Sequence, residues 1–364
     1  MAKTLVTGRE SMTSKQRVQA FFRNEETDRV PIDMAWNPLI RKRVMEHFDA
    51  KTDDELRAAL GIDFMGIGGQ YKGPDLFEKI PERQVHPYYG WHLRWVEHGE
   101  GGYWDYCDFP LEHATVDEVA AWPFPDPDDF DYSHIEARLD TYPDTGFHAG
   151  SAGCACIMNT TGFLRSMEQM FVDLVTDDEA GLLLIDRLMA QQLTDTERVL
   201  EAGKGKIDFL WMGEDLGTQI APLIGMETFR KHIRPRQQPF FDLAKRFGIP
   251  TLFHTCGSSS WAYEDYIEMG LTGVDTLQPE ATNMDPACLK ETFGGRLVFH
   301  GCISSTGALS FGTPDEVEAD CRKTLEIMMP GGGYAFSPTH SLQDNTPTEN
   351  VIRMYETVHQ HGWY

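Results

Sequence analysis

The chain has 364 residues, which suits either two domains or a single α/β barrel that carries insertions. Apolar residues make up 41% and charged residues 24%, an ordinary globular composition that excludes a disordered or collagen-like chain. The 32 Lys and Arg against 57 Asp and Glu leave a net charge of −25, which opposes binding to phosphate backbones and anionic membranes. We therefore expect neither nucleic acid nor a membrane as a partner.

The N-terminal residues contain no apolar run of signal-peptide length, and no stretch approaches the roughly 20 apolar residues of a membrane span. We expect a cytoplasmic protein whose residues 1–11 are poorly ordered. Seven cysteines are an odd number in a chain too long to need disulfide staples. Free thiols or metal ligands are therefore favoured over a disulfide framework.

Short apolar or β-branched runs alternate with segments of helical spacing from residue 29 onward, a pattern typical of parallel strands joined by helical crossovers. Eight such runs are found, at residues 30–36, 62–68, 146–150, 207–213, 251–254, 273–277, 296–301 and 333–337. Eight strands close a barrel whose interior is just filled by side chains. The sequence predicts an α/β fold, a (β/α)8 TIM barrel that forms one domain over residues 12–364.

The helices between these runs have recognisable limits. Residues 228–247 are predicted to be helical and to be kinked or divided by Pro235 and Pro239. Another helix is expected over residues 313–329, where a Thr-Pro pair gives the start signal, and a second Thr-Pro pair at residues 346–347 opens the last helix.

Residues 70–142 are too many for a simple loop and are rich in Trp, Tyr, Asp and Pro. We interpret them as an insertion after the second strand, with a small hairpin near residues 90–104, that covers part of the barrel mouth. The segment contains six notable aromatic residues, Tyr88, Tyr89, Trp91, Trp95, Trp104 and Tyr106. Packing of the insertion is their favoured role, and a cage for a flat or cationic methyl donor is the alternative.

In such a barrel the active site lies at the carboxyl ends of the strands. His254 and Cys256 stand two positions apart in extended chain, so their side chains point the same way and offer a zinc-type metal two ligands. Cys302 closes a strand two places along the barrel and is predicted to be the third ligand. Three ligands would leave an open fourth position, as in catalytic zinc sites. The alternative is a hydrogen-bonded histidine beside buried core thiols.

Other polar residues end the remaining strands. Glu214 and Asp215 are adjacent carboxylates, which favours one site residue and one helix cap. We predict Glu214 and His340 as catalytic residues, and Trp36, Asp215 and Gln278 as substrate-binding residues. His340 has three possible functional roles: as a metal ligand, as an acid or base, and as a residue that orients substrate. The non-functional alternative is a strand-end histidine that is hydrogen-bonded to backbone.

Six segments spread over nearly the whole chain resemble the uroporphyrinogen decarboxylase superfamily, and in particular its corrinoid-linked methyltransferase branch. They are MTSKQRVQAFFRNEETDRVPID, GEDLGTQ, FHTCGSS, GVDTLQP, FGGRLVFHG and SPTHSLQDNTPTENV. The resemblance implies a (β/α)8 barrel. The decarboxylases of the superfamily have an arginine-containing segment that handles porphyrinogen carboxylates, whereas this chain reads AWNPLIRKR at that place. Porphyrinogen decarboxylation is therefore disfavoured.

The methyltransferases of the superfamily are similar to this chain in a His-x-Cys metal pair, which falls here on His254 and Cys256. Their third ligand is a cysteine after strand eight, where this chain has Thr-His-Ser at residues 339–341. The third ligand therefore lies between Cys302 and His340, with Glu214 as a further candidate.

The leading hypothesis is zinc-dependent methyl transfer between a partner corrinoid protein, which carries cobalamin, and a small thiol, methoxy or methylamine compound. Zinc would lower the pKa of a thiol acceptor and make it nucleophilic at neutral pH. One alternative is a metal-free decarboxylase that uses Glu214, Asp215 and His340 on a small carboxylated substrate. Another is a non-catalytic barrel that binds a cobalamin or tetrapyrrole.

Overall fold

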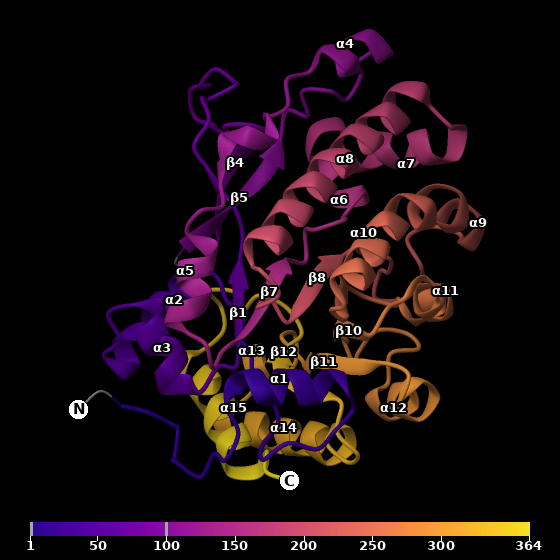
Figure 1. The fold of residues 1–364 in the computed structure, drawn as a ribbon. Helices are drawn as coiled ribbons and strands as arrows, with labels where there is room; N and C mark the ends of the chain where they lie inside the picture. Colours follow the sequence, from indigo (N-terminus) through magenta and orange to yellow (C-terminus); the bar gives the residue numbers. More distant parts are fainter. Residues whose placement is uncertain (1–2, 99–100) are drawn as a thin grey trace.

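The computed structural model describes residues 3–98 and 101–364 of the chain. Its centre is a curled parallel sheet of seven strands, with helices outside it that connect successive strands (Figure 1). The strands, in their order across the sheet, are β1 (Phe64–Ile67), β7 (Gly146–Gly150), β8 (Phe209–Gly213), β9 (Thr251–Thr255), β10 (Gly273–Thr276), β11 (Val298–Ile303) and β12 (Tyr334–Pro338). β11 and β12 are buried at every residue, which is why they read as nearly continuous apolar runs.

The predicted strands and the observed strands agree at seven places, where each boundary lies within two residues of its prediction. The eighth prediction, a strand over residues 30–36, is wrong. That segment makes isolated parallel bridges from Ile32 to Phe336 and from Trp36 to Leu342, and the Asp63 N–H donates to the Ile32 carbonyl on its other side. It therefore lies beside β12 and the start of β1 without forming a regular ladder, because Pro31 has no N–H to donate.

The helices around the sheet follow the predicted alternation. Before β1 they are α1 (Ser14–Phe22), α2 (Pro38–Phe48) and α3 (Asp53–Leu60). The later ones are α6 (Met158–Arg165), α7 (Met167–Thr176), α8 (Glu179–Ala202), α9 (Met226–Thr228), α10 (Arg234–Phe247), α11 (Tyr263–Met269), α12 (Pro286–Phe293), α13 (Ala308–Phe311), α14 (Pro314–Met328) and α15 (Thr348–His361). No helix in the described residues is both long enough and apolar enough to cross a membrane.

The helix predicted over residues 228–247 is divided, as its prolines indicated. A π-helical segment, Phe229–Ile233, separates α9 from α10. Pro235 stands in the first turn of α10, where a missing N–H costs little, and Pro239 lies inside the helix. The predicted start of α14 is confirmed, since Thr313 forms a capping box at its N-terminus.

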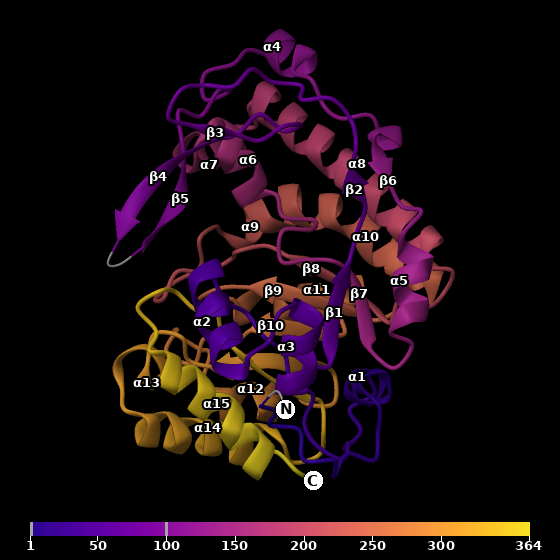
Figure 2. The same ribbon diagram turned by 90° about the vertical axis from the view of Figure 1, so that its left-hand side faces the viewer.

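Between β1 and β7 the chain leaves the sheet and forms small elements. These are β2 (Gln70–Tyr71), β3 (Gln84–Val85), β4 (His92–His98), β5 (Gly101–Cys107), α4 (Val116–Ala121), a 3-10 turn (Pro127–Asp129), β6 (Phe130–Asp131) and α5 (Ile135–Thr141). Of these, β4, β5 and α4 lie toward the end of the molecule opposite the two termini (Figures 1 and 2). β4 and β5 pair antiparallel in the region of the predicted hairpin, and residues 99–100 of that prediction lie outside the described residues.

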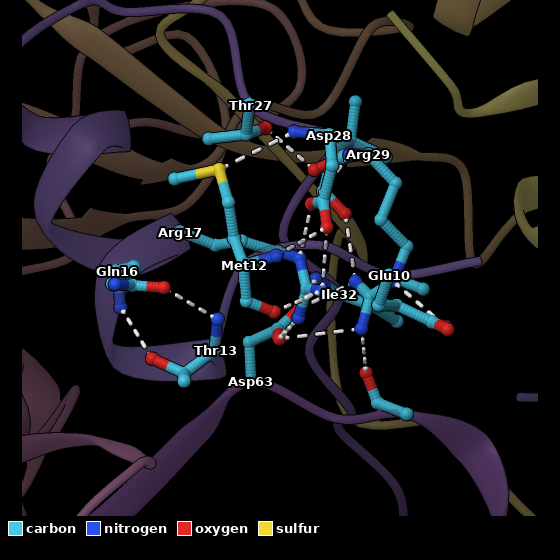
Figure 3. A network of polar contacts seen from close by, with 12 residues as sticks. Glu10, Met12, Thr13, Gln16, Arg17, Thr27, Asp28, Arg29, Ile32 and Asp63 are labelled. Carbon is cyan, nitrogen blue, oxygen red and sulfur yellow. Dashed lines mark hydrogen bonds and ion pairs between the residues drawn. The ribbon is translucent and has the colours of Figure 1, made fainter. Parts of the chain in front are cut away.

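At the amino side of the sheet, a buried ionic network ties the N-terminal segment to β1 (Figure 3). Asp63, the residue before β1, pairs with Arg17 at 3.0 Å and with Arg29 at 2.6 Å, and Asp28 lies 2.6 Å from Arg17. Asp63 also accepts the N–H of Ile32 at 2.8 Å. Residues 1–2 of the segment predicted to be poorly ordered lie outside the described residues, whereas the Leu5 N–H donates to the Ala59 carbonyl.

Candidate metal centre

The carboxyl end of β9 carries two of the predicted ligands. His254 lies on β9 and Cys256 follows the strand by one residue, and the His254 Nε2 and Cys256 Sγ atoms are 3.4 Å apart. The i, i+2 spacing therefore brings these two side chains together, as extended chain requires. Both residues are partly exposed, so a ligand can reach them from the mouth of the sheet.

The third member of the group is Asp215, which follows β8. Its Oδ1 atom lies 3.8 Å from His254 Nε2 and accepts the N–H of Cys256 at 3.1 Å. One ligand atom from each of the three residues lies within 4.8 Å of the other two. β8 and β9 are neighbours with Gly213 opposite His254, so the loop after β8 passes directly over the end of β9.

Asp215 is fixed as a carboxylate. Asn159 donates from Nδ2 to its Oδ2 atom at 2.8 Å. Burial opposes ionisation of Asp215, but the nearby His254 and the hydrogen bonds from Asn159 and Cys256 outweigh burial, and the pKa of Asp215 is lowered. Burial also raises the pKa of the Cys256 thiol, and His254 opposes that rise. A bound cation would favour the thiolate that metal binding requires.

Behind His254, polar side chains cross the end of the sheet. His254 Nδ1 donates to Asp275 Oδ2 at 2.7 Å, and the other oxygen of Asp275 accepts from His300 Nδ1 at 2.6 Å. His300 Nε2 lies 3.2 Å from Asp33 Oδ2. Burial opposes protonation of His254, but Asp275 and Cys256 raise its pKa well above its usual range, so Nε2 also carries a proton without a metal. A bound metal would displace the Nε2 proton while Asp275 keeps the proton on Nδ1, an arrangement common behind histidine ligands.

The charges of this relay stabilise one another. Burial opposes ionisation of Asp275, but His300 and His254 outweigh it and hold the pKa of Asp275 well below its usual range. Burial also opposes protonation of His300, but Asp275 and Asp33 raise its pKa to about 9. The sequence reading missed Asp33, Asp275 and His300. Each of them lies within a predicted, largely apolar strand. Ionisable residues are buried in such strands only when they have partners, so this pattern could have pointed to the network.

Cys302, the predicted third ligand, lies outside the group. It is 1% exposed, belongs to the hydrophobic core, and its pKa is raised by burial. Its backbone is left-handed, with φ +68°, so its side chain departs from the regular alternation on which the prediction depended. Asp215, predicted to bind substrate, takes the place beside His254 and Cys256 that was assigned to Cys302.

Glu214 points away from the metal group into the protein. It is fully buried and accepts the backbone N–H groups of Ile157 at 2.7 Å and Met158 at 3.1 Å, at the start of α6. Burial raises its pKa to about 8, and these backbone donors oppose the rise. The structure thus gives Glu214 a role in holding α6. His340, the other predicted catalytic residue, is exposed, with Nδ1 3.3 Å from the Ser341 carbonyl oxygen.

The other two predicted substrate-binding residues, Gln278 and Trp36, make different contacts. Gln278 accepts the N–H of Gly257 at 2.6 Å, so it supports the turn that follows Cys256. Trp36 is half-buried and packs edge-on against Tyr355, with ring centroids 6.2 Å apart. Gln278 therefore supports the site through backbone, and Trp36 packs on the helix α15.

A parallel α/β sheet with polar side chains gathered at its carboxyl end is typical of proteins with the TIM-barrel type of fold. The family model for uroporphyrinogen decarboxylase (URO-D) matches residues 133–361, well over half of the chain, and the chain belongs to this family. The superfamily predicted from the sequence segments is therefore confirmed.

Curated relatives are similar over part of their length. A uroporphyrinogen decarboxylase from Legionella pneumophila (strain Lens) is 24% identical over 219 residues, which cover 60% of this chain and 58% of the relative. One from Azoarcus sp. (strain BH72) is 27% identical over 114 residues, which cover 31% of this chain and 30% of the relative. The matched region is thus less than two thirds of these relatives.

A solved structure described as a methyltransferase from Methanosarcina mazei superposes with a TM-score of 0.64 at 18% sequence identity. The superposition covers 96% of this chain and 99% of the other. The two chains therefore share their fold over nearly their whole length.

Proposed function

We propose that the chain is a zinc-dependent methyltransferase, with zinc held by Asp215, His254 and Cys256. The observation that carries the proposal is the convergence of one oxygen, one nitrogen and one sulfur ligand at the carboxyl end of neighbouring strands. Three protein ligands with a free fourth position are typical of catalytic zinc rather than structural zinc.

The geometry of the donor atoms suits the metal. Ligand atoms on a tetrahedral zinc lie about 3.5 Å apart, given metal–ligand distances of roughly 2.0 to 2.3 Å. The His254 Nε2 atom is 3.4 Å from Cys256 Sγ and 3.8 Å from Asp215 Oδ1. The pair His254 and Asp275 supplies the hydrogen bond that orients a histidine ligand. Little rearrangement is needed to place zinc among the three side chains.

Zinc bound here would supply a Lewis acid that lowers the pKa of a thiol in the fourth position. The chain's own residues prepare that position. Asp275 would hold the proton on Nδ1 of His254 when a metal takes the place of the Nε2 proton. Asn159 holds the outer oxygen of Asp215, and Gln278 fixes the turn after Cys256. The three ligands are thus held before any metal or substrate arrives, which reduces the cost of ordering them.

The methyl group would pass between the small molecule and cobalamin carried on a partner corrinoid protein. Two findings support this reading: the sequence resembles the corrinoid-linked branch of the superfamily, and the chain shares its fold with a methyltransferase. The rival reading is a metal-free decarboxylase, which the names of the curated relatives favour. Recognition of carboxylates normally uses Arg or Lys. Within the described residues, neither type hydrogen-bonds to Asp215, His254 or Cys256.

Metal content of variants tests the proposal. Purified protein should contain about one zinc per chain, and Cys256→Ser and Asp215→Asn should lose most of it. Cys302→Ala, at the core thiol, and Cys288→Ser, at an exposed thiol, are the matched controls and should keep it. Zinc retained in Asp215→Asn but lost in Cys302→Ala would contradict the ligand set.

A second assay separates the two reactions. The protein, a corrinoid carrier and a methylated substrate should together change the visible spectrum of the cobalamin, and Cys256→Ser should abolish the change. Release of carbon dioxide from a carboxylated substrate, without a corrinoid and undiminished in Cys256→Ser, would establish the decarboxylase reading instead.

A further inference from the structure

A cavity of about 430 Å³ opens at the carboxyl ends of β1 and β7, where the chain that joins these two strands contributes part of its lining. Its walls come from the loops after β1 and β7, from α6 and α8, and from the segment over residues 88–130. Its volume is that of a small-molecule site.

Six aromatic side chains line this aromatic cavity and form one continuous wall: Phe130, Tyr88, Tyr89, Trp91, Phe163 and Tyr106. Successive ring centroids along that series are 5.4, 4.6, 4.9, 5.6 and 3.5 Å apart. Ring faces carry partial negative charge, so a wall of this kind attracts cations. The other two aromatics singled out in the sequence, Trp95 and Trp104, face each other on the β4–β5 hairpin and are about half exposed.

Asp195 on α8 is the one carboxylate of the lining, which contains no lysine, arginine or histidine among the described residues. Tyr132 donates to its Oδ1 atom at 2.6 Å. Within residues 3–98 and 101–364, no hydrogen bond reaches its Oδ2 atom. Burial raises the pKa of Asp195, and the hydrogen bond from Tyr132 and the charge of Arg198 oppose the rise. Arg198, on the same helix, pairs directly with Asp128, at 2.7 Å.

The aromatic cavity and the metal group share a short stretch of chain. Thr160 lines the cavity, and its neighbour Asn159 holds Asp215 at 2.8 Å. Cys154 also lines the cavity, and its carbonyl accepts the N–H of Gly213, two residues before Asp215. A molecule in the cavity therefore lies next to the loops that carry the metal ligands.

We propose that the aromatic cavity binds a quaternary alkylammonium cation, with the ring wall around its methyl groups and Asp195 as the counter-charge. The pairing fits each feature of the lining: a cation gains from the rings, compensates the carboxylate and meets no positive side chain among the residues that line the cavity. The net charge of −25 also attracts cations to the protein.

Binding of the cation does not depend on the metal, whereas its use as methyl donor rests on the proposed methyl transfer. In that use, one C–N bond breaks and its electron pair stays on nitrogen, so the ammonium leaves as a neutral tertiary amine. The methyl group would pass to the reduced corrinoid of the partner protein, which would supply the electron pair and so be oxidised by two electrons. No proton is taken up or released.

Calorimetric titration of the full chain with choline tests the proposal. The neutral control ligand is 3,3-dimethyl-1-butanol, which has the same shape without the charge. We expect saturable choline binding at least tenfold tighter than binding of the neutral analogue, both in zinc-loaded protein and in Cys256→Ser. Choline binding by parent protein that contains no zinc and takes up none would therefore overturn the proposed function and leave this inference standing.

Variants locate the binding. Asp195→Asn and Trp91→Leu should each weaken choline binding at least tenfold, and Trp95→Leu on the exposed hairpin should leave it unchanged. Tyr132→Phe removes the hydrogen bond from Tyr132 to Asp195 but leaves the carboxyl group in place, so this variant should still bind choline. That result would show that Asp195→Asn acts through the lost carboxylate and not through altered packing. Equal affinity for the neutral analogue, tighter binding of methoxybenzene than of choline, or no binding of choline would overturn the proposal.

Discussion

His148 on β7 should make the protein sensitive to acid. Its imidazole is fully enclosed, packs with ring centroids 5.1 Å from Phe209 and 4.9 Å from Trp211, and has an Nδ1 atom without a partner in the described residues. Burial lowers the pKa of His148 to about 4, against about 6.5 in an unfolded chain. The folded protein therefore holds the neutral ring over a pH range in which the unfolded chain takes up a proton.

The sign and size of the effect follow from that difference. Between pH 6.5 and 4 the unfolded state binds one proton more than the folded state, so the free energy of unfolding decreases as the pH falls. A difference of about 2.5 pH units at about 1.4 kcal/mol per unit gives a loss of about 3 kcal/mol, complete once the pH is below 4. Above pH 6.5 the group contributes no pH dependence.

Urea denaturation at a series of pH values from 7 to 4 measures this loss. His148→Phe removes the titrating ring. Between pH 7 and pH 4 its free energy of unfolding should therefore fall by about 3 kcal/mol less than that of the parent protein, whatever the stability of the variant at pH 7. His113→Phe, at an exposed position, is the control and should keep the parental slope. An unchanged slope in His148→Phe would refute the reasoning.

Two further predictions concern the ionic network and the metal group. Asp63→Asn leaves two buried arginines short of a counter-charge and should lower the free energy of unfolding by about 3 kcal/mol in urea denaturation. Asp53→Asn, in an exposed pair, should change it by less than about 1 kcal/mol. Asp275→Asn removes the charge that orients His254 and should weaken zinc binding roughly 10 to 100-fold in competition with a chelating dye. Affinity equal to that of the parent protein would exclude a positioning role for Asp275.

The sequence predicted the parts of the fold that depend on local pattern. Strands buried on both faces give apolar runs that stand out from the helices between them, so seven strands were located closely. The segment over residues 30–36 has the same composition, but Pro31 has no N–H to donate and the segment pairs with β12 only through isolated bridges. Backbone hydrogen bonds decide whether such a segment becomes a strand of the sheet, and the hydrophobicity of the sequence does not predict these bonds.

The same distinction divides the candidate site. His254 and Cys256 were found because their proximity follows from two residues of extended chain. Asp215 comes close only through the register of β8 on β9, which a single sequence does not reveal. Cys302 was assigned by counting strands around a barrel, and one left-handed residue is enough to spoil such an argument.

The position of His254 is set across the width of the sheet. Its partner Asp275 lies on β10, His300 on β11, and Asp33 on the segment beside β12, so three separate stretches of chain fix one imidazole. Asp215, by contrast, is held by Asn159 at the start of α6, beside the aromatic cavity. His254 is thus held by side chains on several strands, whereas Asp215 is held by a residue of α6 next to the proposed cation site. A ligand that shifts α6 would act on the metal through Asp215 and leave His254 in place.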